Sequence, residues 1–179
     1  MSKNSFKVLR PGINTTFQDL GRDNLYHVGL PFSGAIDKRN FLIANSLITN
    51  KEDDAVLEFA YQGPLLEFSG SQTSIVITGN VNFKIIKKDT SEIKGECYRT
   101  YNLNNKDCLD IISTEKSVYG YLSVKGGFKL NKFCNSYSTT VRAEVGPNDG
   151  KKIGIGQTII LNAADSSIKK SLEYFNSKI

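Results

Sequence analysis

Short runs of β-forming residues, each closed by turn residues, restrict the possible folds of this 179-residue chain more than any other feature. Gly, Pro, Asn, Asp or Ser bounds each run, as is typical of strands joined by tight turns. The runs cover residues 6–9, 15–18, 55–60, 65–68, 73–78, 82–86, 97–101, 108–112, 118–124, 140–145 and 158–161. So many short strands predict a mostly-β barrel or sandwich rather than an alternation of strands and helices.

Two segments predict helices. Apolar residues recur at helical spacing between residues 41 and 48, and Asp37 in front of them is a good N-cap. Residues 165–177 carry a second apolar pattern at helical spacing, with a polar opposite face. We therefore expect one domain over residues 1–163, with a short helix after the first strands, and a helical tail over residues 164–179.

Composition excludes several classes of function. The net charge of +5 arises from 23 Lys and Arg against 18 Asp and Glu, and no basic run is longer than two residues. Scattered cations of this kind predict a solvated surface and no nucleic-acid interface. The first residues lack an apolar signal core, and no apolar run is long enough to span a membrane. Three cysteines without a CxxC pair suit a reducing compartment, so we expect a cytoplasmic protein.

The single histidine, His27, rules out a metal site built from several histidines, and we expect no metal site in this chain. His27 lies just before a Gly-Leu-Pro turn. Because its unperturbed pKa lies near neutrality, it could act as a base or bind a substrate. A hydrogen bond to nearby backbone is the plainer interpretation, and the sequence leaves both open.

The turn at residues 31–37 leads directly into the first predicted helix. A helix start carries unpaired N–H groups and a partial positive charge, and Gly34 would let a ligand approach the backbone. Ser33 and Gly34 could therefore hold a carboxylate or phosphate. Alternatively, Asp37 simply caps its own helix and Ser33 stabilises the turn, and the Asp37 carboxylate would repel an anion there.

Two charged residues lie within predicted strands. By strand alternation, Glu58 shares a face with Val56 and Ala60, where burial would raise its pKa and suit it to acid–base work. An exposed strand face is the equally good alternative. Arg142 lies on the polar face of the run 140–145 and could clamp a carboxylate, or pair with an acidic residue on a neighbouring strand.

Taken together, these segments resemble the family that contains the C subunit of 5-oxoprolinase and allophanate hydrolase subunit 2, also described as biotin-dependent carboxyltransferase subdomains A and B. The matching pieces run through nearly the whole chain. They are RPG at 10–12, TTFQDLGR at 15–22, GLPFSGAID at 29–37, ANSL at 44–47, LE at 57–58, GPL at 63–65, TG at 78–79, YLSVKGG at 121–127 and SYSTTVRA at 136–143. The pair formed by the second and third pieces is specific, because chance agreement over that many ordered positions is remote.

The resemblance implies a cyclophilin-like β-barrel and an enzyme component that works with partner subunits on a small carboxylate or lactam. Family members take part in the ATP-dependent opening of 5-oxoproline to glutamate, and ATP would act through the complex. A carboxyltransferase component of a urea carboxylase-like system, which would need a biotinylated carrier, is one alternative. A non-catalytic module, like the family members that antagonise a kinase inhibitor, is another.

The candidate site combines the residues singled out above with one taken from the resemblance. The catalytic candidates are Glu58 and Asp37, and the substrate-binding candidates are Ser33, Gly34, Asn45, Arg142 and His27. Two departures from the family bear on this site. The chain resembles only the first of the family's two barrel-like halves, so we expect a second half to complete the pocket. The usual Gly-Ser-Arg-Ser becomes Asn-Ser-Tyr-Ser, and the arginine lost at Tyr137 is a group that pairs with anions.

Overall fold

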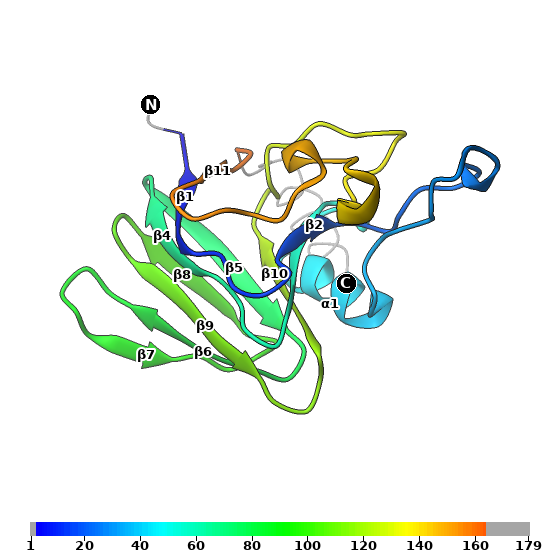
Figure 1. Cartoon of the computed structure of the whole chain (residues 1–179). Coiled ribbons are helices and arrows are strands. Elements are labelled where there is room, and N and C mark those ends of the chain that lie inside the picture. Colours follow the sequence, from blue (N-terminus) through cyan, green and yellow to red (C-terminus); the bar gives the residue numbers. More distant parts are fainter. Residues whose placement is uncertain (1–2, 164–179) are drawn as a thin grey trace, which may run out of the picture.

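The computed structural model describes residues 3–163, and two antiparallel sheets form its framework. The first sheet has six strands in the order β11-β1-β4-β9-β6-β7 (Figure 1). Its strands are β1 (Ser5–Arg10), β4 (Leu65–Ser69), β6 (Val81–Ile86), β7 (Glu92–Lys94), β9 (Cys108–Thr114) and β11 (Thr158–Ile160). The first and the last described strands therefore pair directly, with Phe6 opposite Ile159.

The second sheet has five strands in the order β2-β3-β10-β5-β8. Its strands are β2 (Thr16–Gln18), β3 (Val56–Ala60), β5 (Gln72–Thr78), β8 (Thr100–Asn104) and β10 (Tyr119–Val124). The prediction of a mostly-β fold is confirmed. Closure of the sheets into a cyclophilin-like barrel stays a prediction from the resemblance.

The main core lies where inward-facing side chains of the two sheets meet. Strand β6 shows the alternation, since Val81, Phe83 and Ile85 are buried while the residues between them are half-buried. Strand β3 contributes Leu57 and Phe59 to the same core. Because apolar residues that leave water supply the main favourable free energy of folding, this alternation holds the sheets together.

The helix α1 (Lys38–Leu47) covers the outer face of the second sheet, against β5 and β10. Its Phe41 packs with Val56 and Tyr121, so β3 is buried on both faces. The Asp37 side chain accepts a hydrogen bond from the Asn40 N–H at 3.1 Å, as an N-cap residue should. The predicted helix and its cap are confirmed.

Short helical turns lie within the longer loops: η1 (Tyr26–Val28), η2 (Val141–Ala143) and η3 (Asn148–Gly150). Figure 1 shows the loop between β2 and α1 extending away from the sheets, with η1 at its tip. No helix among residues 3–163 is long and apolar enough to cross a membrane. The predicted tail helix lies outside the described residues.

Two strand predictions are wrong. The run 140–145 is not a strand but a chain reversal, because Thr140 and Val145 bridge each other and η2 lies between them. The run 97–101 begins too early, because Tyr98 has φ +64° in a turn and β8 starts only at Thr100. In both places, residues that usually favour strands form a turn.

Candidate functional site

The turn at residues 31–37 is held against the segment that follows β2. Ser33 and Gly34 both have left-handed backbone, with φ of +58° and +88°. A Cβ on Gly34 would lie only 2.9 Å from the Gly21 nitrogen, so this position requires glycine. The Ala35 N–H donates to the Asp19 carbonyl at 2.9 Å. The turn is therefore a fixed structure rather than a free loop.

Glu58 lies directly beneath this turn and is only 4% exposed. Its Oε2 accepts hydrogen bonds from the Ile36 N–H at 2.8 Å and from the Tyr121 hydroxyl at 2.9 Å. The same hydroxyl accepts from the Asp37 N–H at 2.7 Å. Glu58 therefore takes up, directly and through Tyr121, the two N–H groups that precede α1.

Burial shifts the pKa values of both Glu58 and Tyr121. It raises the pKa of Glu58, and the hydrogen bonds from Ile36 and Tyr121 only partly oppose that effect. Burial and the neighbouring Glu58 carboxyl also raise the pKa of Tyr121. Of the two interpretations of Glu58, the buried one is confirmed. A carboxyl in this position can carry a proton closer to neutral pH than an exposed glutamate can.

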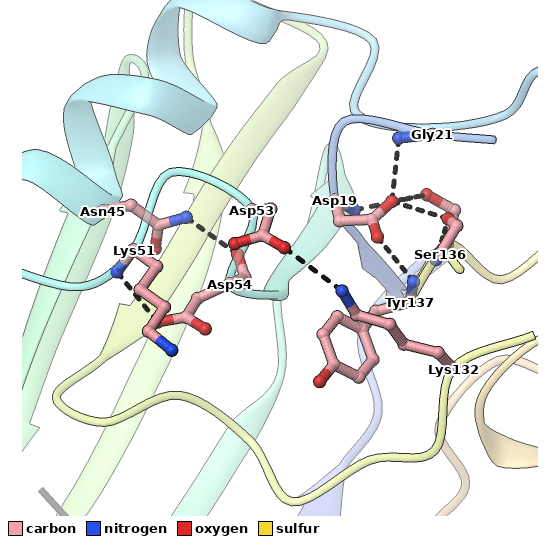
Figure 2. A network of polar contacts seen from close by, with 10 residues as sticks. Asp19, Gly21, Asn45, Lys51, Asp53, Asp54, Lys132, Ser136 and Tyr137 are labelled. Atoms are coloured by element: carbon pink, nitrogen blue, oxygen red, sulfur yellow. Dashed lines mark hydrogen bonds and ion pairs between the residues drawn. The ribbon is translucent and has the colours of Figure 1, made fainter. Parts of the chain in front are cut away.

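A second polar cluster, the Asp19 cluster, ties this region to a distant part of the chain. Asp19 is 3% exposed. Its carboxylate accepts hydrogen bonds from the Gly21 N–H at 2.8 Å, the Ser136 hydroxyl at 2.7 Å, the Ser138 hydroxyl and the Tyr137 N–H. Figure 2 shows the Asp19 side chain between Gly21 and the pair Ser136 and Tyr137. One buried carboxylate thus joins the QDLG segment (residues 18–21) to the NSYS segment (residues 135–138).

Arg22 connects the Asp19 cluster to the turn. Its guanidinium donates to the Thr140 hydroxyl at 2.8 Å and to the Ser138 carbonyl, and the hydroxyls of Thr140 and Ser33 hydrogen-bond to each other. The side chain is almost fully buried, and its Nε has no hydrogen-bond partner among the described residues. Burial lowers the pKa of Arg22, and Asp19 partly opposes this shift. The buried Arg22 guanidinium therefore positions Ser33 through the hydroxyl of Thr140.

The structure brings only some of the predicted site residues together. Ser33, Gly34, Asp37 and Glu58 lie around the turn and the start of α1. The Asp37 carboxylate is engaged by the N–H and the side-chain amide of Asn40, the latter at 2.7 Å.

The other three predicted site residues lie apart from the turn. Asn45 is buried on α1, where its amide donates to the Asp54 carbonyl at 2.7 Å and accepts from the Ser123 hydroxyl at 2.8 Å. His27 is exposed in η1, and Arg142 is exposed in η2. The expectation that Arg142 stands on the polar face of a strand is therefore wrong, since η2 replaces that strand.

Sequence reasoning missed several residues that organise this region, chiefly Asp19, Arg22 and Thr140. They lie within the TTFQDLGR and SYSTTVRA segments, so the resemblance indicated the right segments but not the pairing between them. Among the described residues, no group of three or more His, Cys, Asp or Glu could hold a metal ion. The roles of ATP and biotin remain predictions.

The arrangement can be compared with known proteins. Residues 28–178 match the family described as carboxyltransferase domain, subdomain A and B. The chain belongs to this family. The match includes α1, most strands of both sheets and the NSYS segment, so the family assignment covers the fold and most of the candidate site.

The relatives are enzymes or enzyme subunits, all longer than the part that this chain matches. The C subunit of 5-oxoprolinase from Haemophilus influenzae is 31% identical over 156 residues, covering 87% of this chain and 48% of that protein. The urea amidolyase of Saccharomyces cerevisiae is 28% identical over 170 residues, covering 94% of this chain and 9% of that protein. A crystal structure of the K. lactis urea amidolyase gives a TM-score of 0.82 at 28% identity, over 91% of this chain and 10% of that one.

Proposed function

We propose that this chain is a component of an ATP-dependent amidohydrolase that opens 5-oxoproline to glutamate together with partner subunits. The observation that carries the proposal is the 31% identity to the C subunit of 5-oxoprolinase over 87% of the chain. Because the chain spans about half of that relative's length, we further propose that a second barrel half completes the pocket. ATP would activate the ring carbonyl on a partner of this chain.

The turn and its buried carboxyl support a division of roles within this chain. Ser33 and Gly34 would receive the substrate carboxylate, because the turn is held rigidly and lies at the start of α1. Glu58 would hold or release the proton that opening the lactam requires, as its raised pKa suits a general acid or base. Asp37 would keep the helix start in place through its cap.

The Ser33 assignment has a matched control within the structure. Ser33→Ala and Thr140→Val each remove the hydrogen bond between these two hydroxyls. Thr140→Val also removes an acceptor of Arg22, and only Ser33→Ala removes the proposed substrate ligand. In the reconstituted complex, ATP-dependent glutamate release should show a KM for 5-oxoproline raised about tenfold by Ser33→Ala, the usual value of a hydrogen bond to a charged group. Thr140→Val should raise KM less.

Equal effects of the two substitutions would show that the hydroxyl pair only supports the turn. The complex should be assayed with and without a supplied second half, and with the Haemophilus influenzae protein as a positive control. If the control complex releases glutamate and the complex containing this chain does not, the proposed function is wrong.

A carboxyltransferase role is the second candidate, and the TM-score of 0.82 against urea amidolyase favours it. In that case the same pocket would accept urea and a biotinylated carrier from outside this chain. Carboxylation of urea by a mixture of biotin carboxylase, carrier and this chain distinguishes the two roles. Glutamate release without urea carboxylation supports the first candidate, and the reverse result supports the second.

A further inference from the structure

A polar cavity of about 270 Å³ lies on the far side of Tyr137 from the Asp19 cluster, at the C-terminal end of α1. Segments distant in the sequence line it with charged, amide and phenol side chains: Asn50, Lys51, Asp54, Lys125, Tyr137 and Asn162. Only Tyr137 also belongs to the candidate site described above, through its backbone N–H in the Asp19 cluster. The volume is several times the roughly 30 Å³ that one liquid water occupies, so the cavity has room for a small organic molecule.

One part of the lining is a rigid frame. The Asn50 amide donates to the Val124 carbonyl at 2.7 Å and accepts from the Gly126 N–H at 2.9 Å. The Lys125 ammonium donates to the Ile48 carbonyl at 2.9 Å and to Thr49, which places a fixed positive charge at the end of α1. The cavity therefore keeps its shape and its charge without a ligand.

The other part of the lining offers hydrogen-bonding groups to a ligand. Within the described part of the chain, the Lys51 ammonium, the Tyr137 hydroxyl and the second carboxylate oxygen of Asp54 have no hydrogen-bond partner. Figure 2 shows the Tyr137 hydroxyl pointing to the side of the network where Lys51 and Asp54 lie. The Lys132 ammonium, 4.8 Å from the Tyr137 ring centre and paired with Asp53, holds that ring in place.

The charges of these groups restrict the ligand. Two lysines against one carboxylate favour an anion, but a bare anion would leave Asp54 with a like charge beside it. Burial and the neighbouring Asp53 carboxylate raise the pKa of Asp54, and Lys51 and Lys132 only partly oppose that shift. A ligand that carries both a carboxylate and a cationic N–H group meets both requirements.

We propose that this cavity binds a free α-amino acid. The carboxylate would lie against Lys51 and the Tyr137 hydroxyl, within the field of Lys125, and the ammonium would lie against Asp54. The proposal of this site does not rest on the lactam-opening reaction proposed above. Because the Tyr137 N–H donates to Asp19, the cavity and the Ser33 turn share the Asp19 cluster. A bound amino acid would therefore be connected to the Ser33 turn through Tyr137 and the Asp19 cluster.

Calorimetric titration of the full chain tests the site, with L-glutamate and L-alanine as probes and glutarate as the analogue that lacks the ammonium. We expect saturable binding of at least one amino acid and about tenfold weaker binding of glutarate. Lys51→Met and Asp54→Asn should each weaken amino-acid binding about tenfold. Lys94→Met, on the exposed strand β7 of the other sheet, should leave it unchanged.

Circular dichroism of each variant checks that the fold is retained. No binding of either amino acid at millimolar concentration would overturn the proposal. Equal affinity for glutamate and glutarate would overturn the role of Asp54. Unchanged binding by both Lys51→Met and Asp54→Asn would place any bound amino acid elsewhere on the molecule. None of these readouts requires ATP or partner proteins, so failure here and failure of the proposed function are distinguishable.

Discussion

At the scale of single residues, Glu58 shows how a polar side chain can be retained inside a β protein. Each of its hydrogen bonds comes from the backbone or side chain of a different element, so burial does not leave the carboxylate without partners. The compensation is incomplete, since burial still raises its pKa. The folded state therefore binds a proton at Glu58 more tightly than the unfolded state does.

This difference predicts a pH-dependent contribution to stability. The contribution of Glu58 to the free energy of unfolding is fully present below the ordinary pKa of 4.5 and is lost as the pH rises through the raised pKa. Glu58→Gln keeps an acceptor for Ile36 and Tyr121 but does not titrate. As the pH rises above 4.5, we expect the free energy of unfolding of wild type to fall relative to that of Glu58→Gln.

Urea unfolding of both proteins across this pH range measures the effect. Glu52→Gln, which changes an exposed glutamate, serves as the control and should follow wild type. Parallel pH profiles for wild type and Glu58→Gln would contradict the assignment of a raised pKa.

At the scale of elements, the Asp19 cluster does what no strand pairing does: it fixes two irregular segments to each other. A loop has no regular backbone partners, so its polar groups must find side chains or water. Here one carboxylate satisfies two backbone N–H groups and two hydroxyls. Without that carboxylate, all four donors lose their shared acceptor in the interior of the protein.

We therefore expect Asp19→Ala to lower the free energy of unfolding by about 3 kcal/mol or more, the usual cost of leaving a charged hydrogen-bond network incomplete. Asp23→Ala, four residues away at an exposed position, should change stability little. Urea unfolding compares the two variants. Limited proteolysis should also detect faster cleavage within residues 131–140 of Asp19→Ala. Equal stability of the variants would mean that the segments are held by other contacts.

Local sequence predicted the elements whose signals are local. Alternation and turn residues placed most strands within one or two residues, and Asp37 marked the start of α1. The run 140–145 failed because β-prone residues there surround a reversal, which only contacts with Arg22 and Val145 reveal. Asp19 was missed as a site residue for the same reason. Apart from Gly21, its partners lie more than a hundred residues away, and no periodicity connects them.

At the scale of the whole molecule, the two sheets depend on side chains that fit closely at the core. Ile111 on β9 is fully buried, and a Cβ added at Gly63 would lie only 2.3 Å from it. The next residue, Ile112, is 44% exposed because the strand alternates its faces. Two identical side chains on adjacent positions therefore face the core and the solvent.

Ile111→Ala should reduce the free energy of unfolding by about 2–5 kcal/mol, because it leaves a cavity between the sheets. Ile112→Ala should cost about 1 kcal/mol or less, mainly through β-propensity. Thermal and urea unfolding of the pair measure both values. Similar costs at the two positions would contradict the described packing of β9.

The pairing of β1 with β11 has a consequence for biosynthesis. Ser5 to Lys7 cannot meet Thr158 to Ile160 until about 150 further residues have left the ribosome. At roughly 5–20 residues per second, that wait lasts about eight to thirty seconds. Throughout it one edge of the earliest strand has no neighbour, so nascent chains at this stage should be substrates for chaperones that shield exposed strand edges.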